Sequence, residues 1–118
     1  MVAVTELRVA TAIVGDECVL MLTGDIDMSC SEMIADLGVG TLESHRIRRL
    51  VVDLSEVTFM DSTGLNALVR MNRVASAQGK LLSLRNPPER VRKTLSITAL
   101  DTVLRIEASG APPLDASA

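Results

Sequence analysis

The chain has 118 residues, a net charge of −3 and a hydrophobic fraction of 47%, which suits one domain with a core of its own. The acidic balance argues against a nucleic-acid-binding protein, because such proteins normally carry a concentrated basic patch. Charges interrupt every apolar run before the roughly 18–20 residues that a membrane helix needs, and the first residues lack the pattern of a signal peptide, so we expect no membrane insertion.

The first predicted element is a β-hairpin. Leu7, Val9 and Ile13 fall on one face of an alternating pattern, the turn Gly15-Asp16-Glu17 follows, and residues 18–22 form an apolar run. A Gly-Asp turn between two such runs is typical of antiparallel strands. The polar residues 23–27 are expected to lead out of the second strand.

A helix is predicted to begin at Ser29, which has capping-box spacing with Glu32. Its buried stripe is expected to consist of Met33, Ile34, Leu37 and Leu42. Gly38 and Gly40 each cost about 1 kcal/mol relative to alanine inside a helix. The helix is therefore expected to be bent, tightly packed at the glycines, or broken there.

The middle of the chain predicts a strand, a loop and a second helix. Residues 50–54 are apolar at successive positions, as in a parallel strand that is covered on both faces. Residues 55–60 are expected to form a loop. After Asp61 and Ser62, apolar residues recur at helical spacing as far as Gly79, namely Leu65, Leu68, Met71, Val74 and Ala75.

The last third predicts one more helix between two strands, at residues 80–84 and 103–106. Pro87-Pro88 is expected to open this short helix, because proline is tolerated in a first turn. Residues 108–118 have little to bury and are expected to be a disordered tail.

Strands that alternate with helices predict a single α/β domain over residues 1–107. Its sheet is expected to have five strands, mostly parallel, with an antiparallel strand at the N-terminus and flanking helices. The residue inventory disfavours an enzyme, because the single histidine, His45, leaves no Ser-His-Asp set to assemble. Cys18 and Cys30 lack metal-ligand or disulfide spacing. We therefore expect no metal, no cofactor and a reducing, cytoplasmic location.

The junction Asp61-Ser62-Thr63-Gly64 is the candidate functional site. It places a hydroxyl at a helix N-terminus, where unpaired backbone N–H groups favour negative charge. Two interpretations stay open on the residues alone. Either Asp61 or Ser62 is a plain helix cap, which contributes about 1 kcal/mol, or Ser62 is a serine to which a phosphoryl group is added and from which it is removed.

The surroundings of this serine favour a surface with a function. Phe59 and Met60 are bulky apolar residues just before the cap, so the serine is expected to lie on an apolar rim. Asp25 and Asp27 leave the preceding strand at the corresponding end of a parallel sheet, which would bring carboxylates close to the hydroxyl.

Residues 51–65, with the sequence VVDLSEVTFMDSTGL, resemble the signature of STAS domains, in particular the bacterial anti-sigma factor antagonists. Residues 23–27 and the closing segment 95–106 extend the resemblance over nearly the whole chain. It implies a small non-enzymatic domain that binds an anti-sigma factor with a histidine-kinase-like ATPase fold. It also implies that this partner phosphorylates Ser62 and that a serine phosphatase resets the switch.

By the same resemblance, the unphosphorylated protein sequesters the anti-sigma factor and frees a sigma factor, and phosphorylation of Ser62 switches it off. The residues expected to contact the partner are Asp25, Asp27, Asp61, Ser62, Thr63, Gly64, Leu65 and Asn66. Asn66 departs from the glycine that many antagonists have.

The alternative is a STAS scaffold in a stress-signalling or lipid-transport complex, in which Ser62 is not phosphorylated. A small nucleotide-binding or hydrolytic enzyme is disfavoured by the missing catalytic residues.

Overall fold

The structure, a computed structural model, describes residues 7–107 except the side chain of Asp101. In chain order its elements are β1 (Arg8–Val14), β2 (Glu17–Ile26), α1 (Ser31–Leu42), β3 (Arg49–Met60), α2 (Ser62–Ala77), β4 (Leu81–Arg85), α3 (Glu89–Ile97), the 3₁₀ turn η1 (Leu100–Thr102) and β5 (Arg105–Glu107). The five strands form one sheet in the order β1-β2-β3-β4-β5, in which β1 is antiparallel to β2 and the other pairs are parallel. The predicted fold class is therefore confirmed. The tail predicted at residues 108–118 lies outside the described residues.

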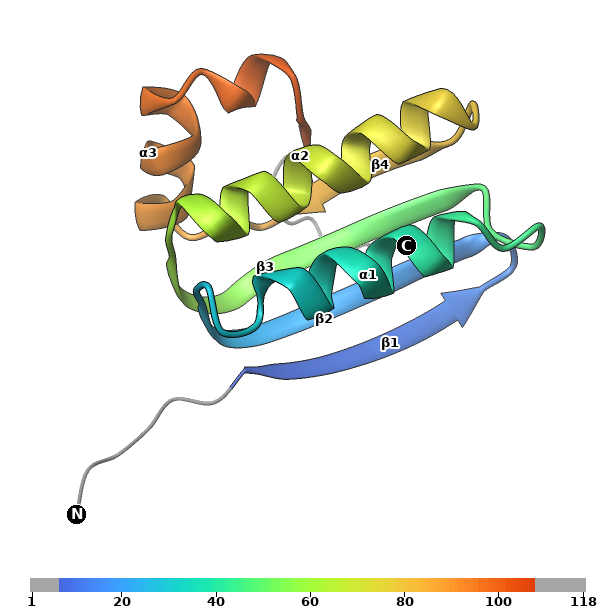
Figure 1. The fold of residues 1–118 in the computed structure, drawn as a ribbon, viewed down its shortest axis with the longest axis horizontal. Coiled ribbons are helices and arrows are strands. Elements are labelled where there is room, and N and C mark those ends of the chain that lie inside the picture. The colour runs from blue at the N-terminus through green and yellow to red at the C-terminus, as the bar shows by residue number, and fades with distance from the viewer. Residues whose placement is uncertain (1–6, 108–118) are drawn as a thin grey trace, which may run out of the picture.

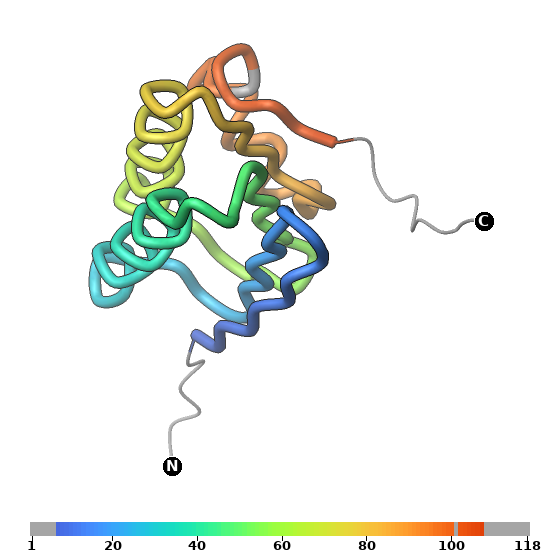
Figure 2. The backbone as a smooth tube through the Cα atoms, turned by 90° about the vertical axis from the view of Figure 1, so that its right-hand side faces the viewer, coloured from blue at the N-terminus to red at the C-terminus, as the bar shows by residue number. Residues whose placement is uncertain are grey.

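Helices α1 and α2 lie side by side on one face of the sheet (Figure 1), and Figure 2 shows both on the same side of the strands. The alternation along β2 reflects this arrangement. Cys18, Leu20 and Leu22 are buried toward the helices, whereas Val19 and Met21 on the opposite face are only half buried. The apolar core therefore lies between the sheet and the helices, as expected of a layered α/β domain.

The N-terminal hairpin is confirmed, with a two-residue turn at Gly15-Asp16 between the paired residues Val14 and Glu17. Gly15 has a φ of +62°, the left-handed conformation that glycine adopts at least cost. The predicted strand exit at residues 23–27 is too early, because β2 continues to Ile26.

The loop predicted at residues 55–60 is wrong, because β3 runs without a break to Met60. This half of β3 pairs with the end of β2, and the register shifts twice, between Met21 and Thr23 and between Gly24 and Asp25. Each shift places an additional β3 residue opposite β2, as in a β-bulge. Pairing with a distant strand therefore outweighs the polar sequence of the segment.

The capping box predicted at Ser29 is also wrong. Helix α1 begins at Ser31, and its cap residue Cys30 makes no side-chain cap bond. Ser29 instead donates its backbone N–H and its hydroxyl to Asp27 Oδ1, at 2.9 and 2.6 Å. Such local turns of aspartate and serine compete with helix formation, so the helix begins later than predicted.

The buried stripe of α1 is only partly as predicted. Ile34 and Leu42 are buried, but Met33 is 51% exposed and Leu37 is 36% exposed. The small residues Ala35 and Gly38 are buried instead. The helix is continuous, so of the three alternatives for its glycines the structure supports tight packing, which occurs at Gly38.

The second half of the chain follows the prediction closely. Helix α2 ends at Ala77, two residues before Gly79. Pro88 is the N-terminal cap residue of α3 rather than a member of its first turn. The last strand begins at Arg105 rather than at residue 103, because the N–H groups of Val103 and Leu104 still bond back to the carbonyl oxygen of Leu100.

Candidate functional site

The candidate site lies where β2 and β3 end and α2 begins. The backbone N–H of Asp61 donates to the carbonyl oxygen of Ile26 at 3.1 Å. This bond brings the start of α2 directly beside Asp27, the residue that follows β2. The main chains of Asp27 and Asp61 are therefore adjacent at this end of the sheet, and the meeting of their carboxylates near Ser62 stays a prediction.

Asp61 is the N-cap of α2. Its Oδ1 accepts the N–H of Thr63 at 2.9 Å, the hydroxyl of Thr63 at 2.6 Å and the N–H of Gly64 at 3.2 Å. These bonds stabilise the ionised carboxylate, so they lower the pKa of Asp61, the Thr63 hydroxyl contributing most and partial desolvation opposing the shift. Of the two capping candidates, Asp61 rather than Ser62 has this role.

Ser62 is the first residue of α2 and is exposed. The cap bonds of the helix are accepted by its neighbour, so the serine side chain stands at the N-terminus without serving as the N-cap. A hydroxyl in this position is accessible from solvent, as a protein kinase requires.

Gly64 and Leu65 lie beneath this surface. A Cβ on Gly64 would stand 2.7 Å from Met60 Cγ and 2.8 Å from Ile26 Cγ2, so glycine lets α2 approach the strands closely. Leu65 is only 6% exposed. Both residues position the first turn of α2, whereas Ser62 and Asn66 present exposed side chains.

Asp25 and Asp27 have different settings. Asp25 lies within β2 opposite Phe59, and its Oδ1 accepts the hydroxyl of Thr58. Asp27 lies in the loop and holds Ser29, as described above. Asp25 thus binds across to β3, whereas the carboxylate of Asp27 stabilises the turn that leads into α1.

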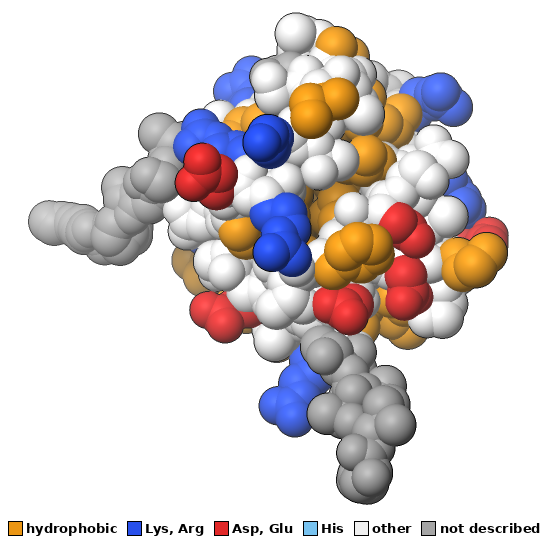
Figure 3. All heavy atoms as spheres, turned by 90° about the vertical axis from the view of Figure 1, so that its left-hand side faces the viewer, with side chains coloured by type: hydrophobic (Ala, Val, Ile, Leu, Met, Phe, Trp, Pro, Cys, Tyr) orange, Lys and Arg blue, Asp and Glu red, His pale blue; other side chains and the backbone are white. Residues whose placement is uncertain are grey.

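Three exposed apolar side chains belong to the segments that form this end of the molecule. Met28 is 76% exposed, Met33 51% and Phe59 44%. Figure 3 shows hydrophobic side chains interspersed with acidic ones on this end of the protein. The predicted apolar rim is thus supplied by Phe59, whereas Met60 is buried. Apolar periodicity predicts Met33 in the core and does not indicate Met28, although a methionine between the polar residues Asp27 and Ser29 is a signal for an exposed apolar residue.

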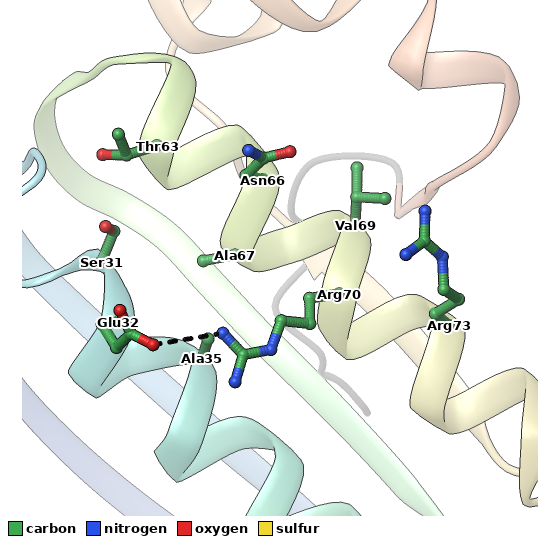
Figure 4. Close-up of a pocket in the computed structure, with 9 residues that line it drawn as sticks. All are labelled: Ser31, Glu32, Ala35, Thr63, Asn66, Ala67, Val69, Arg70 and Arg73. Atoms are coloured by element: carbon green, nitrogen blue, oxygen red, sulfur yellow. Dashed lines mark ion pairs between the residues drawn. The ribbon is translucent and has the colours of Figure 1, made fainter.

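A groove of about 420 Å³ lies between α1 and α2, and Thr63, the residue after Ser62, is part of its lining (Figure 4). Its lining includes Ser31, Glu32, Thr63, Asn66, Arg70 and Arg73. Arg70 bridges the two helices, with Nη1 3.7 Å from Glu32 Oε2 and Nη2 3.2 Å from Asp36 Oδ1. The groove therefore runs along the facing sides of both helices from the first turn of α2.

Within residues 7–107, no group of three His, Cys, Asp or Glu side chains is arranged to hold a metal ion. None of the helices in this range is long and apolar enough to cross a membrane. Cys18 is buried in β2, and burial raises the pKa of its thiol.

Comparison with known proteins places the chain in a family. Residues 9–106 match the family model described as "Mlab, STAS domain". The anti-sigma-B factor antagonist of Bacillus subtilis is 31% identical over 87 residues, which cover 74% of this chain and 78% of that protein. Among solved structures, TM1081 of Thermotoga maritima has a TM-score of 0.79 at 24% identity and covers 88% of this chain and 87% of its own. The antagonist SpoIIAA in its unphosphorylated form has a TM-score of 0.71 at 20% identity, with 89% of each chain covered. The chain belongs to the STAS domain family and, within it, to the anti-sigma factor antagonists.

Proposed function

We propose that the protein is a cytoplasmic phosphorylation switch whose unphosphorylated form sequesters an anti-sigma factor and frees a sigma factor. The partner is an anti-sigma factor with a histidine-kinase-like ATPase fold, which supplies the ATP and phosphorylates Ser62. A separate serine phosphatase restores the active form, and the protein itself performs no catalysis.

One observation carries the proposal: Ser62 is exposed at the start of α2, and Asp61 serves as the cap in its place. A buried or capping serine would be a structural residue only. A related structure is described as SpoIIAA in the phosphorylated form and has a TM-score of 0.66 at 19% identity, which is consistent with a fold that tolerates such a group.

The charges near Ser62 supply a physical reason for release. A phosphoserine adds about −1.5 to −2 charges, and here it would stand beside the carboxylates of Asp27 and Asp61. The helix N-terminus offsets only part of this repulsion. Arg70, two turns along α2, is already engaged by Glu32 and Asp36.

At an interface the dianion must in addition lose its water, which is costly without a cationic partner. A loss of about 3 kcal/mol weakens binding more than a hundredfold. Such a change releases the partner without any refolding of the antagonist.

The test incubates the protein with ATP, Mg²⁺ and the candidate anti-sigma kinase and measures its intact mass. We expect the mass of one phosphate to be gained by the wild type and by Thr63→Val, and not by Ser62→Ala. Thr63→Val is the matched control because it removes the neighbouring hydroxyl. Phosphate on Ser62→Ala, or none on the wild type, would reject the proposal.

Binding titrations complete the test. We expect Ser62→Asp to bind the anti-sigma factor at least tenfold more weakly than the wild type, whereas Ser62→Ala binds but is not released by ATP. Equal titration curves for Ser62→Asp and the wild type would contradict the charge mechanism.

The alternative function is that of a STAS scaffold in a stress-signalling or lipid-transport complex. It is retained because the matched family model is described as "Mlab, STAS domain". In that case the partner binds the same exposed surface but leaves the mass of the protein unchanged in the presence of ATP. The intact-mass experiment therefore separates the two functions.

A further inference from the structure

The outer edge of the sheet is formed by β1. Within residues 7–107, β1 pairs with β2 on one side and has no strand on its other side. Ile13 is 64% exposed and Val14 74% exposed. Edge strands are usually protected by lysine, proline, a bulge or a covering element. Residues Arg8–Val14 contain neither lysine nor proline, and their pairing with β2 is regular.

We propose that β1 pairs with β1 of a second copy of this chain, antiparallel and with a two-fold axis at Thr11, so that two sheets join into one. This inference concerns self-association and does not depend on phosphorylation of Ser62. The edge fits a second copy because its backbone, its apolar side chains and its charges are each self-complementary.

The backbone determines the register. In a two-residue hairpin the residues that flank the turn, here Val14 and Glu17, form a hydrogen-bonded pair. Hydrogen-bonded and non-hydrogen-bonded pairs then alternate along the ladder. The N–H and C=O groups of Val9, Thr11 and Ile13 consequently point away from β2, toward the free edge.

An axis at Thr11 places outward-pointing groups opposite one another along the whole strand. Thr11 then faces Thr11 of the second copy, and Val9 faces Ile13 of the second copy. An axis at Ala10 or Ala12 would oppose groups that already point toward β2. An axis between two residues would oppose outward-pointing groups with inward-pointing ones, and an axis at Val9 or Ile13 would shorten the overlap.

The side chains agree with this register. On the helix-facing side, Val9 packs beside Ile13 of the second copy, so the pair removes exposed apolar surface from water. On the other side, Arg8 lies opposite Val14 of the second copy, whose partner on β2 is Glu17. The arginine side chain can reach across to that carboxylate. Arg8 is the only charged residue of β1, and in this register it does not lie opposite Arg8 of the second copy. No like charges therefore oppose each other.

The dimer leaves the candidate functional site free. Strand β2 separates β1 from β3 and α2, which carry Phe59 and Ser62. A seven-residue edge is a small interface. We therefore expect weak association, with a dissociation constant in the micromolar range or higher.

Sedimentation velocity over a concentration series tests the association. We expect the weight-average mass of the wild type to rise toward twice the monomer mass. Thr11→Pro removes the N–H at the axis and is tolerated in an edge strand; we expect it to weaken the dimer at least tenfold. Thr11→Val keeps the N–H and is the control. A wild type that stays monomeric throughout, or a Thr11→Pro variant that associates like Thr11→Val, would overturn the proposal.

A disulfide experiment tests the register without relying on a proline variant. Ala10 and Ala12 of the second copy form a non-hydrogen-bonded pair in the proposed dimer, where Cα atoms are about 4.5 Å apart and a disulfide is feasible. We expect an Ala10→Cys protein and an Ala12→Cys protein to form a covalent dimer under mild oxidation when mixed. Each protein alone, and the wild type with Cys18 and Cys30, should form much less. Equal yields from a single variant and from the mixture would refute the register.

Discussion

Gly38 of α1 lies against Met71 of α2, so closely that a Cβ on Gly38 would stand 2.0 Å from Met71 Sδ and 2.8 Å from its Cγ. Met71 is fully buried. Glycine in a helix interior costs about 0.5–1 kcal/mol relative to alanine. The cost is offset here by the close approach of the two helices that line the groove beside Ser62.

Gly38→Ala should therefore destabilise the protein by about 1–3 kcal/mol, the usual cost of overpacking a core. Gly40 is the matched control, because a Cβ there meets nothing within 4 Å. Gly40→Ala should stabilise the protein by about 0.5–1 kcal/mol through helix propensity alone. Urea unfolding of both variants checks the opposite signs, and two equal shifts would show that the contact with Met71 is unimportant.

Lys80 binds the C-terminal end of α1. Its Nζ donates to the carbonyl oxygen of Leu42 and, at 2.8 Å, to that of Ser44. A cation at the helix C-terminus stabilises carbonyl groups that lack intrahelical partners. Lys80→Met should lower the free energy of unfolding by about 1–2 kcal/mol. Lys93→Met, at an exposed position of α3, should change the free energy of unfolding by less than about 0.5 kcal/mol. Thermal unfolding checks both variants, and equal midpoints would contradict the stabilising role of Lys80.

The second helix could be predicted from the sequence because its signals are local. Asp61 is a good cap residue, and the apolar spacing that follows agrees with it, so propensity and packing point the same way. The second half of β3 could not be predicted in this way. Its residues Ser55, Glu56 and Thr58 are polar, and their strand conformation comes from pairing with β2 across two register shifts.

The α1 stripe shows a second limit of reading apolar periodicity. Helix–helix contact there is made by the small residues Ala35 and Gly38, which a search for large apolar side chains overlooks. The spacing of large apolar side chains therefore predicts Met33 in the core, although it is 51% exposed. The motif around Ser62 was found because its residues are contiguous, whereas the approach of Asp27 depends on a bond between Ile26 and Asp61.

Asp61 should make stability depend on pH in a defined direction. Its pKa in the folded protein is lowered by the bonds from Thr63 and Gly64, so the unfolded chain binds the proton more readily. The stabilisation is therefore complete above the unfolded value of about 3.9 and is lost as the pH falls through the folded pKa.

Two variants separate the charge of Asp61 from its capping role. Asp61→Ala should cost about 1 kcal/mol at neutral pH through loss of the cap. Asp61→Asn keeps an acceptor oxygen and should cost less, and its deficit relative to the wild type should shrink below about pH 4. Urea midpoints measured at neutral and acidic pH give this comparison; a deficit that grew on acidification would have the wrong sign.

Met28 is expected to contribute to binding of the anti-sigma factor. It is 76% exposed beside Asp27, at the end of the protein that also exposes Met33 and Phe59, and a partner that covers it removes this apolar surface from water. Met28→Ala should weaken binding of the anti-sigma factor about tenfold, which corresponds to about 1.4 kcal/mol, and should leave the free energy of unfolding nearly unchanged. Ile97→Ala is the matched control, since Ile97 is equally exposed but lies on α3. Calorimetric titration of both variants distinguishes a local docking surface from nonspecific hydrophobic association. Equal losses of affinity in the two variants would show that Met28 does not belong to a specific interface.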